Sequence, residues 1–388
     1  MATPGAVRGR PRPRPQTAPR DAGPLSRPPP EDRGAAPTAT DRLLGVDAAR
    51  GLALVGMIVV NVGPMPPTSL VHRLYLLPYG RASLLFVVVA GIGAGLVAAR
   101  ALRRGTSRRE VWSAALWRAA VLAALGLGLQ ELTDDIGVVL TLYAVLFLLA
   151  PVLGRLPTWP LVGLAAASLV LGPALVVLHE VLVTSLAPGK PPVQLGDPPG
   201  EMLLGLLVAG RYPLVTWVVP FVVGLLLARA DLAARSTQRR LVGWGAVAAV
   251  GAFGASTLAR ALLGPTADEG FAKLLTGVAH GQMPLWLVSG VGGAAVVVGL
   301  AVRAGQARPA LLRPLAGYGR LALTLYVLHV LVIVAWVPDD LTLAHGVVTS
   351  AALVVGTALV AAVWTRVGGP GPLERLARPF WAPAGGRP

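Results

Sequence analysis

A series of largely uncharged apolar runs, each close to the length of a membrane-spanning helix, constrains this chain more than any other feature. An α-helix needs about 20 apolar residues to cross the hydrocarbon core of a bilayer. Charged residues make up only 13% of the chain, whereas about a quarter of the residues are charged in soluble domains. We interpret the following runs as helices: 46–64, 82–99, 112–130, 136–154, 159–182, 213–228, 242–262, 285–302, 317–337 and 346–365.

These runs predict an all-α fold, a polytopic integral membrane bundle of about ten transmembrane helices. An even number of crossings places both termini on one side. Basic residues then orient the bundle, because cytosolic loops of membrane proteins carry an excess of Lys and Arg. Of the 34 basic residues, 25 fall in the segments assigned to the cytosol, five in outer loops and four within helices or at their ends. We therefore expect cytosolic N- and C-termini in a multi-pass protein of the plasma (inner) membrane.

The charge distribution also bears on partners and domains. A net charge of +16 in a soluble protein would suggest nucleic acid, but here the arginines lie where topology control requires them. We expect the lipid bilayer, and no nucleic acid, as a partner. Residues 1–43 form a Pro- and Arg-rich cytosolic tail that we expect to be disordered. Residues 44–366 form the transmembrane domain, and residues 367–388 a cytosolic C-terminal tail.

Several common chemistries have no motif in this sequence. The chain has no cysteine, which excludes disulfides, thiolate metal sites and a thiol nucleophile. It has no Walker A motif and no GxSxG nucleophile elbow, and without an HxH or HxxxH pair we expect no metal. The glycines of Gly91-Ile-Gly93-Ala-Gly95 lie inside a helix, so we interpret them as a site of close helix packing.

Charged and polar residues within helices are candidates for function, because they are costly in a bilayer. Asp47 and Arg50 are three residues apart on one helical face, so an ion pair is expected, either as an interfacial anchor or as part of a site. Asn61 ends the same helix, where bonding to a neighbouring helix is the common role of an asparagine. Arg320 follows Gly317-Tyr-Gly319, which allows another backbone to approach.

Three histidines are placed to meet at an outward-facing cavity. His72 lies in the outer loop after Asn61, and Arg81 closes that loop. His280 lies in the outer loop before the run 285–302, and His329 is in the outer half of the run 317–337. Imidazole suits acid–base chemistry near neutral pH, so these residues are candidate catalytic groups.

The first two helices resemble a known family. The stretch Gly45-VDAARGLALVGMIVVNVGP-Met65, followed by His72 and by Gly80-RASLLFVVVAGIGAG-Leu96, is similar to the start of transmembrane acetyltransferases related to heparan-α-glucosaminide N-acetyltransferase, and to bacterial YeiB-like membrane proteins. Weaker similarity continues in Gly210-RYPLVTWVVPFVV-Gly224 and Tyr318-GRLALTLYVL-His329. The resemblance implies transfer of acetyl from cytosolic acetyl-CoA to an acceptor across the membrane, with His72 as acyl carrier or base and Asn61 as its partner. The Trp-Asn pair that the sugar acetyltransferases have after this histidine is absent here.

The resulting hypothesis is a membrane-embedded acyltransferase that uses acyl-CoA, with acetyl-CoA as the expected donor and an amino sugar or cell-envelope glycan as the expected extracytoplasmic acceptor. Arg100, Arg103 and Arg104 in the loop after the second helix could bind the CoA phosphates, although topology control alone also explains them. The alternative is a small-molecule or lipid transporter or flippase without acyl transfer. A homodimer is left open.

Overall fold

The computed structural model describes residues 1–2, 39–63, 69–183, 192–277, 280–338 and 341–379, and these residues form helices with no strand among them. Residues 37–388 make up one compact unit, which contains all of the helices. Nearly all of the tail predicted over residues 1–43 lies outside the described residues. Its end does not, because the first helix begins at Ala39, five residues earlier than the predicted domain boundary.

Fourteen α-helices follow one another along the described part of the chain. They are α1 Ala39–Val62, α2 Leu70–Tyr75, α3 Arg81–Arg103, α4 Arg108–Gln130, α5 Leu140–Leu153, α6 Thr158–Val183, α7 Pro199–Leu204, α8 Leu214–Leu227, α9 Arg235–Leu263, α10 Pro284–Ala307, α11 Pro309–Arg320, α12 Ala322–Trp336, α13 Leu343–Val367 and α14 Pro372–Leu376. A π-helical turn, Gly205–Ala209, continues α7.

Nine of the ten apolar runs each correspond to one helix, and the run 317–337 covers the end of α11 and all of α12, but ten crossings are not established. In the described residues seven helices are long and apolar enough to span a bilayer, and two bent pairs raise the number to nine. One pair joins α8 to α7 and its π-helical turn with a bend of 54°, and the other joins α11 to α12 with a bend of 68°. The remaining run, 136–154, contains α5, whose 14 residues reach only about 21 Å, less than the roughly 30 Å hydrocarbon core.

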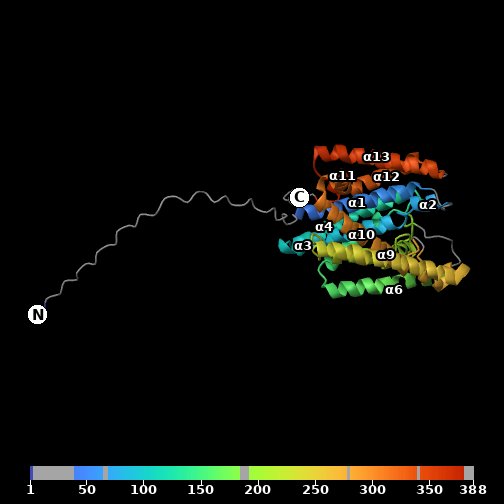
Figure 1. Cartoon of the computed structure of the whole chain (residues 1–388), viewed down its shortest axis with the longest axis horizontal. Coiled ribbons are helices and arrows are strands. Elements are labelled where there is room, and N and C mark those ends of the chain that lie inside the picture. Colours follow the sequence, from blue (N-terminus) through green and yellow to red (C-terminus); the bar gives the residue numbers. More distant parts are fainter. Residues whose placement is uncertain (3–38, 64–68, 184–191, 278–279, 339–340, 380–388) are drawn as a thin grey trace, which may run out of the picture. The chain divides into compact units, whose positions relative to one another are not determined.

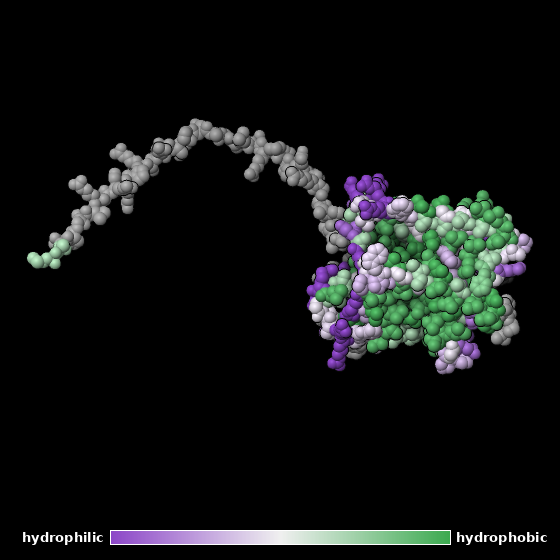
Figure 2. All heavy atoms as spheres, turned by 90° about the horizontal axis from the view of Figure 1, so that it is seen from below, coloured by the Kyte–Doolittle hydropathy of each residue, from purple (hydrophilic) through white to green (hydrophobic). Residues whose placement is uncertain are grey.

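The helices are layered so that apolar side chains also cover the outside of the bundle. Helix α3 lies in the core and packs against α1, α8 and α10, whereas α6, α9 and α13 lie at the periphery (Figure 1). Large apolar side chains are exposed along all three peripheral helices. Figure 2 shows a broad hydrophobic surface over the bundle, with hydrophilic residues gathered toward one end. This surface is what a bilayer requires, because lipid tails solvate exposed apolar side chains.

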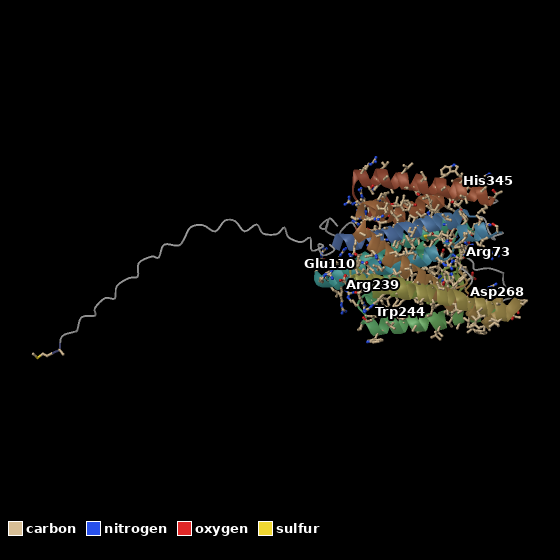
Figure 3. The ribbon with its side chains drawn as sticks, viewed as in Figure 1. Arg73, Glu110, Arg239, Trp244, Asp268 and His345 are labelled. Atoms are coloured by element: carbon tan, nitrogen blue, oxygen red, sulfur yellow. The ribbon has the colours of Figure 1, made fainter. Side chains whose placement is uncertain are left out.

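The two ends of the bundle can be told apart by the residues that lie there. Arg73, Asp268 and His345 lie at one end, which we call the α2 end, and Glu110 and Arg239 lie at the other, which we call the α14 end (Figure 3). The charge distribution in the sequence predicts that the α14 end faces the cytosol.

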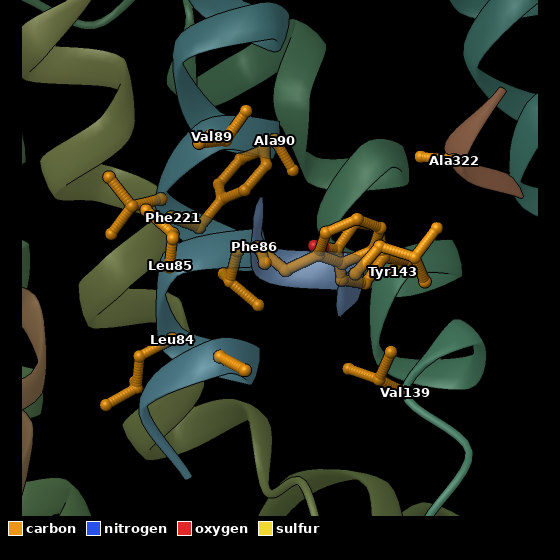
Figure 4. Packing of buried hydrophobic residues seen from close by; sticks show 14 of the residues in the cluster. Leu84, Leu85, Phe86, Val89, Ala90, Val139, Tyr143, Phe221 and Ala322 are labelled. Atoms are coloured by element: carbon orange, nitrogen blue, oxygen red, sulfur yellow. The ribbon is translucent and has the colours of Figure 1, made fainter. Parts of the chain in front are cut away.

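Glycine lets α3 and α8 approach closely. A Cβ added to Gly91 would overlap the Phe221 carbonyl oxygen and lie 3.0 Å from the Gly224 Cα. The sequence-based prediction of close packing around Gly91 is therefore confirmed. Apolar side chains fill the space next to this contact, including Phe221 and Phe86 (Figure 4).

The C-terminal segment after α13 contains a short helix that fixes the break between α11 and α12. The Glu374 carboxylate accepts hydrogen bonds from the backbone N–H groups of Leu323 (2.8 Å) and Thr324 (3.1 Å), and from the Thr324 hydroxyl. It thereby satisfies the N–H groups that the start of α12 leaves unpaired. The Trp117 indole of α4 donates to the Leu376 carbonyl at 2.7 Å, which holds α14 against the bundle.

Candidate functional site

Asn61 and His329 meet where α1 and α12 pack together. The Asn61 Nδ2 lies 3.1 Å from the His329 Nε2, and the His329 Nδ1 lies 3.3 Å from the Leu325 carbonyl oxygen. If Nδ1–H donates to that carbonyl, Nε2 is the acceptor for the Asn61 amide. His329 is fully buried. The expectation that Asn61 bonds a neighbouring helix is confirmed.

Asn61 lines a small pocket near the α2 end. The pocket lies between α1, the start of α3, α12 and the segments around residues 212 and 280. Its polar lining consists of Asn61, Ser83, Tyr212, His280 and Tyr326. The other lining residues are Met57, Val60, Pro78, Gly80, Ala82 and Gly137. We call this the Asn61 pocket.

His280 reaches the pocket from a strained loop. Its φ angle is 57°, in the left-handed region that residues other than glycine seldom adopt. Three aromatic rings surround its imidazole, with centroid distances of 4.9 Å to Tyr79, 6.1 Å to Tyr212 and 5.9 Å to Trp286. These rings hold the imidazole at the wall of the pocket.

Gln282 holds the same loop in place through its buried side chain. It is fully buried and has a φ of 68°. Its Nε2 donates to the Arg211 carbonyl at 2.7 Å, and its Oε1 accepts from the Thr216 hydroxyl at 3.1 Å. Both ends of the amide are thus bonded, which supports two strained residues in one short segment. Sequence reasoning had no signal that singles out Gln282, because a lone glutamine in a loop is usually solvated.

Tyr326 is a second polar group of the pocket that sequence reasoning missed. Its hydroxyl accepts a hydrogen bond from the Val139 N–H at 3.2 Å. Its ring packs edge-on against His329, with centroids 5.1 Å apart, and stacks with Phe86 at 6.5 Å. The spacing of Tyr326 three residues before His329 was the available signal, because residues three apart share a helical face.

His72 does not lie in a loop as predicted, and the described residues that line the Asn61 pocket do not include it. It belongs to α2, where the Ser69 hydroxyl accepts from its backbone N–H at 3.1 Å, and it is only 3% exposed. Tyr75 ties this helix to α1 and α13, with its hydroxyl 3.2 Å from the Val59 carbonyl oxygen and 3.1 Å from the Ser350 hydroxyl. The structure thus brings Asn61 to His329 and His280 and keeps His72 in the adjoining helix.

The Asp47–Arg50 pair forms as the spacing predicted. Its N–O distance is 2.7 Å, and the side chains of Arg50 and Asp47 are 26% and 20% exposed, respectively. Gly319 packs directly on the Asp47 backbone, which confirms the close approach expected before Arg320. Arg320 is exposed and lies within electrostatic reach of Asp47.

Tyr143 of α5 is a buried polar group near the ion pair and the pocket. It lies within electrostatic reach of Arg50, Tyr326 and Tyr212. Its hydroxyl is buried and has no hydrogen-bond partner among the described residues. Figure 4 shows the ring within the packed core near Phe86, Val139 and Ala322. The Phe86 ring contacts both Tyr143 and Tyr326, with centroid distances of 5.4 and 6.5 Å, so Tyr143 is separated from the pocket residue Tyr326 by one aromatic ring.

The remaining predicted site residues do not line the pocket. Arg100, Arg103 and Arg104 are exposed at the end of α3 that lies farthest from it. Arg81 begins α3 and lines a separate groove between α3, α9 and α10. Within the described residues, no group of three or more His, Asp or Glu side chains is arranged to hold a metal ion.

Comparison with known proteins covers the second part of the chain. Residues 227–382 match the family described as "Protein of unknown function (DUF418)". No curated protein matches the chain. The matched segment runs from the end of α8 through α14, so it includes His280, Tyr326 and His329 but not Asn61 or His72.

Proposed function

We propose that this protein is a membrane-embedded acyltransferase. It moves an acyl group, with acetyl as the expected group, from cytosolic acyl-CoA to an acceptor at the α2 end. The observation that carries the proposal is the Asn61 pocket, where an amide hydrogen-bonded to His329 lies beside His280 and Tyr326. Acyl transfer requires such a set, because hydrogen-bond donors must stabilise the oxyanion and a base must take the proton of the acceptor.

Two side chains can donate to the oxyanion. The Asn61 Nδ2 carries two hydrogens, and one of them points to the His329 Nε2. The other is available to a carbonyl oxygen in the pocket. The Tyr326 hydroxyl accepts from the Val139 N–H, so its own proton can be donated to the same oxygen. His329 then acts as a positioning residue, since it fixes the plane of the Asn61 amide.

His280 is the base in this proposal. As the acceptor hydroxyl or amine attacks the thioester carbonyl, the new C–O or C–N bond forms and the acceptor proton passes to His280. The C–S bond breaks, and the CoA thiolate leaves with that proton as a thiol. The resemblance of α1 to acetyltransferases supports a second route. In it the His72 imidazole attacks the thioester carbonyl and a C–N bond forms; the C–S bond breaks, and the CoA thiolate takes up the imidazole proton and leaves as the thiol. The acceptor then attacks the acyl-imidazole, its proton passes to His72, and the C–N bond breaks. That route requires α2 to shift, because His72 is buried in it.

The donor enters from the α14 end. Arg100, Arg103 and Arg104 offer guanidinium groups for the CoA phosphates. The pantetheine arm then passes Arg50 and the buried Tyr143 hydroxyl, which has no hydrogen-bond partner among the described residues. The absence of a side chain on Gly93 leaves room beside the guanidinium of Arg50, since a Cβ there would lie 3.7 Å from its Nη2.

A transporter is the second candidate, and one observation favours it. Both bent helix pairs are of the kind that transporters use to bind substrates in the middle of the bilayer. In that case the substrate passes between Arg50 and the Asn61 pocket, and no acyl bond is broken.

Labelled acetyl-CoA separates the two functions. Purified protein in nanodiscs is incubated with acetyl-labelled CoA and a panel of amino sugars and polyols, and acetylated product is measured. Asn61→Ala should lower the transfer rate by about 100- to 1,000-fold, as for loss of one oxyanion donor. His345→Ala is the matched control, because His345 lies at the α2 end but bonds Thr342. A wild-type protein that neither binds nor hydrolyses acetyl-CoA would refute the acyltransferase.

Histidine variants then distinguish the two routes. Direct transfer predicts loss of product in His280→Ala and normal turnover in His72→Ala. Loss in His72→Ala with retention in His280→Ala would establish the carrier route instead. Normal transfer by Asn61→Ala would show that the chemistry lies outside the Asn61 pocket.

A further inference from the structure

A second cavity near the α2 end holds an arginine without an acidic partner among the described residues. It is a shallow depression between α3, α9 and α10 that is open on one side. Arg81, Phe253, Ser256, Trp286 and Ser289 are among the residues that line it. We call it the Arg81 groove. It does not overlap the residues to which the proposed acyl transfer assigns a chemical role.

The positive charge of the Arg81 guanidinium is not neutralised by an acidic side chain among the described residues. Its Nη1 donates to the Leu77 carbonyl at 3.3 Å, and it forms no ion pair with a described residue. Arg81 is partly buried at the outer end of α3, and a partly buried charge is costly unless it is paired. Unlike Arg260, whose guanidinium is bound by the two Asp268 oxygens at 2.7 and 2.9 Å, Arg81 leaves most of its donors for a ligand.

The helix that starts at Arg81 adds to the positive potential. Arg81 is the first residue of α3, and neither a capping side chain nor an acidic residue stands in its first turn. The N-terminus of a helix carries a partial positive charge, so an acidic residue or a bound anion is favoured there and an arginine is not. The two positive features together favour an anion in the groove.

The groove opens toward lipid. One wall is formed by α9, whose large apolar side chains are exposed at the periphery, including Phe253 at 57% exposed. The opposite wall contains Trp286, whose buried Nε1–H has no hydrogen-bond partner among the described residues. An occupant with an apolar body and an anionic head fits this surface better than a free ion does, because the entrance is apolar.

We propose that the Arg81 groove binds the phosphate of an anionic phospholipid, with the acyl chains lying along the outer surface of α9. Arg81 donates to the phosphate oxygens, and the open side of the groove admits the chains from the bilayer. Trp286 also contacts His280, with ring centroids 5.9 Å apart, and lies against Gly80 of the Asn61 pocket. The bound headgroup therefore stands beside the wall of that pocket.

Lipid binding is measured on the purified full-length protein without acyl-CoA, so the result is independent of the proposed reaction. Native mass spectrometry or a fluorescent-lipid titration compares phosphatidylglycerol with phosphatidylcholine. Wild type should bind phosphatidylglycerol more tightly, and Arg81→Gln should weaken that binding about tenfold or more, as expected for lost hydrogen bonds to a charged group. Arg81→Lys should retain part of it, because the charge stays but the planar fork is lost.

Arg73→Gln is the matched control, since Arg73 is an exposed arginine at the same end of the bundle. An equal loss of binding in Arg73→Gln would reveal general surface charge and overturn the proposal, and so would unchanged binding in Arg81→Gln. Displacement of the lipid by millimolar inorganic phosphate would assign the groove to a free anion instead of a lipid. If Arg81→Gln does not fold, Ser256→Leu tests the same groove by filling it, and unchanged lipid binding in that variant overturns the proposal.

Discussion

The contact between α3 and α8 allows a quantitative prediction, because it is made by backbone atoms that cannot move aside. In Gly91→Ala the new methyl group would overlap the Phe221 carbonyl oxygen and lie 3.0 Å from the Gly224 Cα. A carbon–oxygen contact between packed helices is normally about 3.3–3.6 Å. The two helices must therefore separate, and overpacking of this kind costs about 1–3 kcal/mol.

Gly93→Ala is the matched control, because it makes the same chemical change two residues along the same helix. The atom nearest to its new Cβ is the Arg50 Nη2, at 3.7 Å, which is an ordinary contact at the end of a flexible side chain. Alanine is also the better helix former by about 1 kcal/mol. Gly93→Ala should thus be neutral or mildly stabilising.

The assay is the thermal unfolding of the two variants and the wild type in the same detergent. Gly91→Ala should melt lower by about 2–4 °C for each kcal/mol lost, and Gly93→Ala should melt at or above the wild type. Equal melting of both variants would refute the reasoning, since it would show that the α3–α8 contact relaxes freely. A drop confined to Gly93→Ala would indicate instead that the space around Arg50 is tightly filled.

Three further predictions concern the ends of the bundle. Glu374→Gln should lower stability by about 1–2 kcal/mol in the same melting assay, because it weakens charge-assisted hydrogen bonds to the start of α12. Glu201 is an exposed acidic residue, and Glu201→Gln should leave the stability unchanged. Burial raises the pKa of Tyr75 above its ordinary value of 10.0. The contribution of Tyr75 to stability is therefore present below pH 10 and is lost as the pH rises through the raised pKa. Tyr75→Phe should reduce this loss of stability at alkaline pH, and an unchanged pH profile would contradict the role of Tyr75. Reporter fusions within 229–241 and after Pro388 should read cytosolic and fusions within 192–198 external, whereas an external C-terminus would mean that an odd number of helices cross the membrane.

The sequence predicted the positions of the helices well because a bilayer leaves few alternatives. Unpaired backbone groups are excluded from lipid, so a long apolar run must become a helix. The predictions failed where a run is not one straight helix. The run 317–337 is broken at Leu321 and bends by 68°, and the residue that stabilises the break is Glu374, far along the chain. An isolated acidic residue in a predicted tail gives no sign of that role.

Local spacing predicted the local contacts of the site. Asp47 and Arg50 pair because residues three apart share a helical face, and the glycines around Gly91 and Gly319 mark the closest backbone contacts. The partner of Asn61 could not be obtained in this way. It is His329, which lies 268 residues away in the sequence. The nearer histidine, His72, is part of α2 and is buried. Contacts between distant helices depend on the packing of the whole bundle, which no single run encodes.

The same hydrogen bond explains why the function has to be sought in the whole chain. The segment that matches a family, residues 227–382, supplies His280, Tyr326 and His329. The first helix supplies Asn61, together with the Asp47–Arg50 pair at its other end. Neither part by itself forms the Asn61 pocket, because its walls come from α1, α3 and α12 together with the loops at residues 212 and 280. Substitutions that separate α1 from α12 should therefore abolish the proposed acyl transfer even when every polar residue of the pocket is kept.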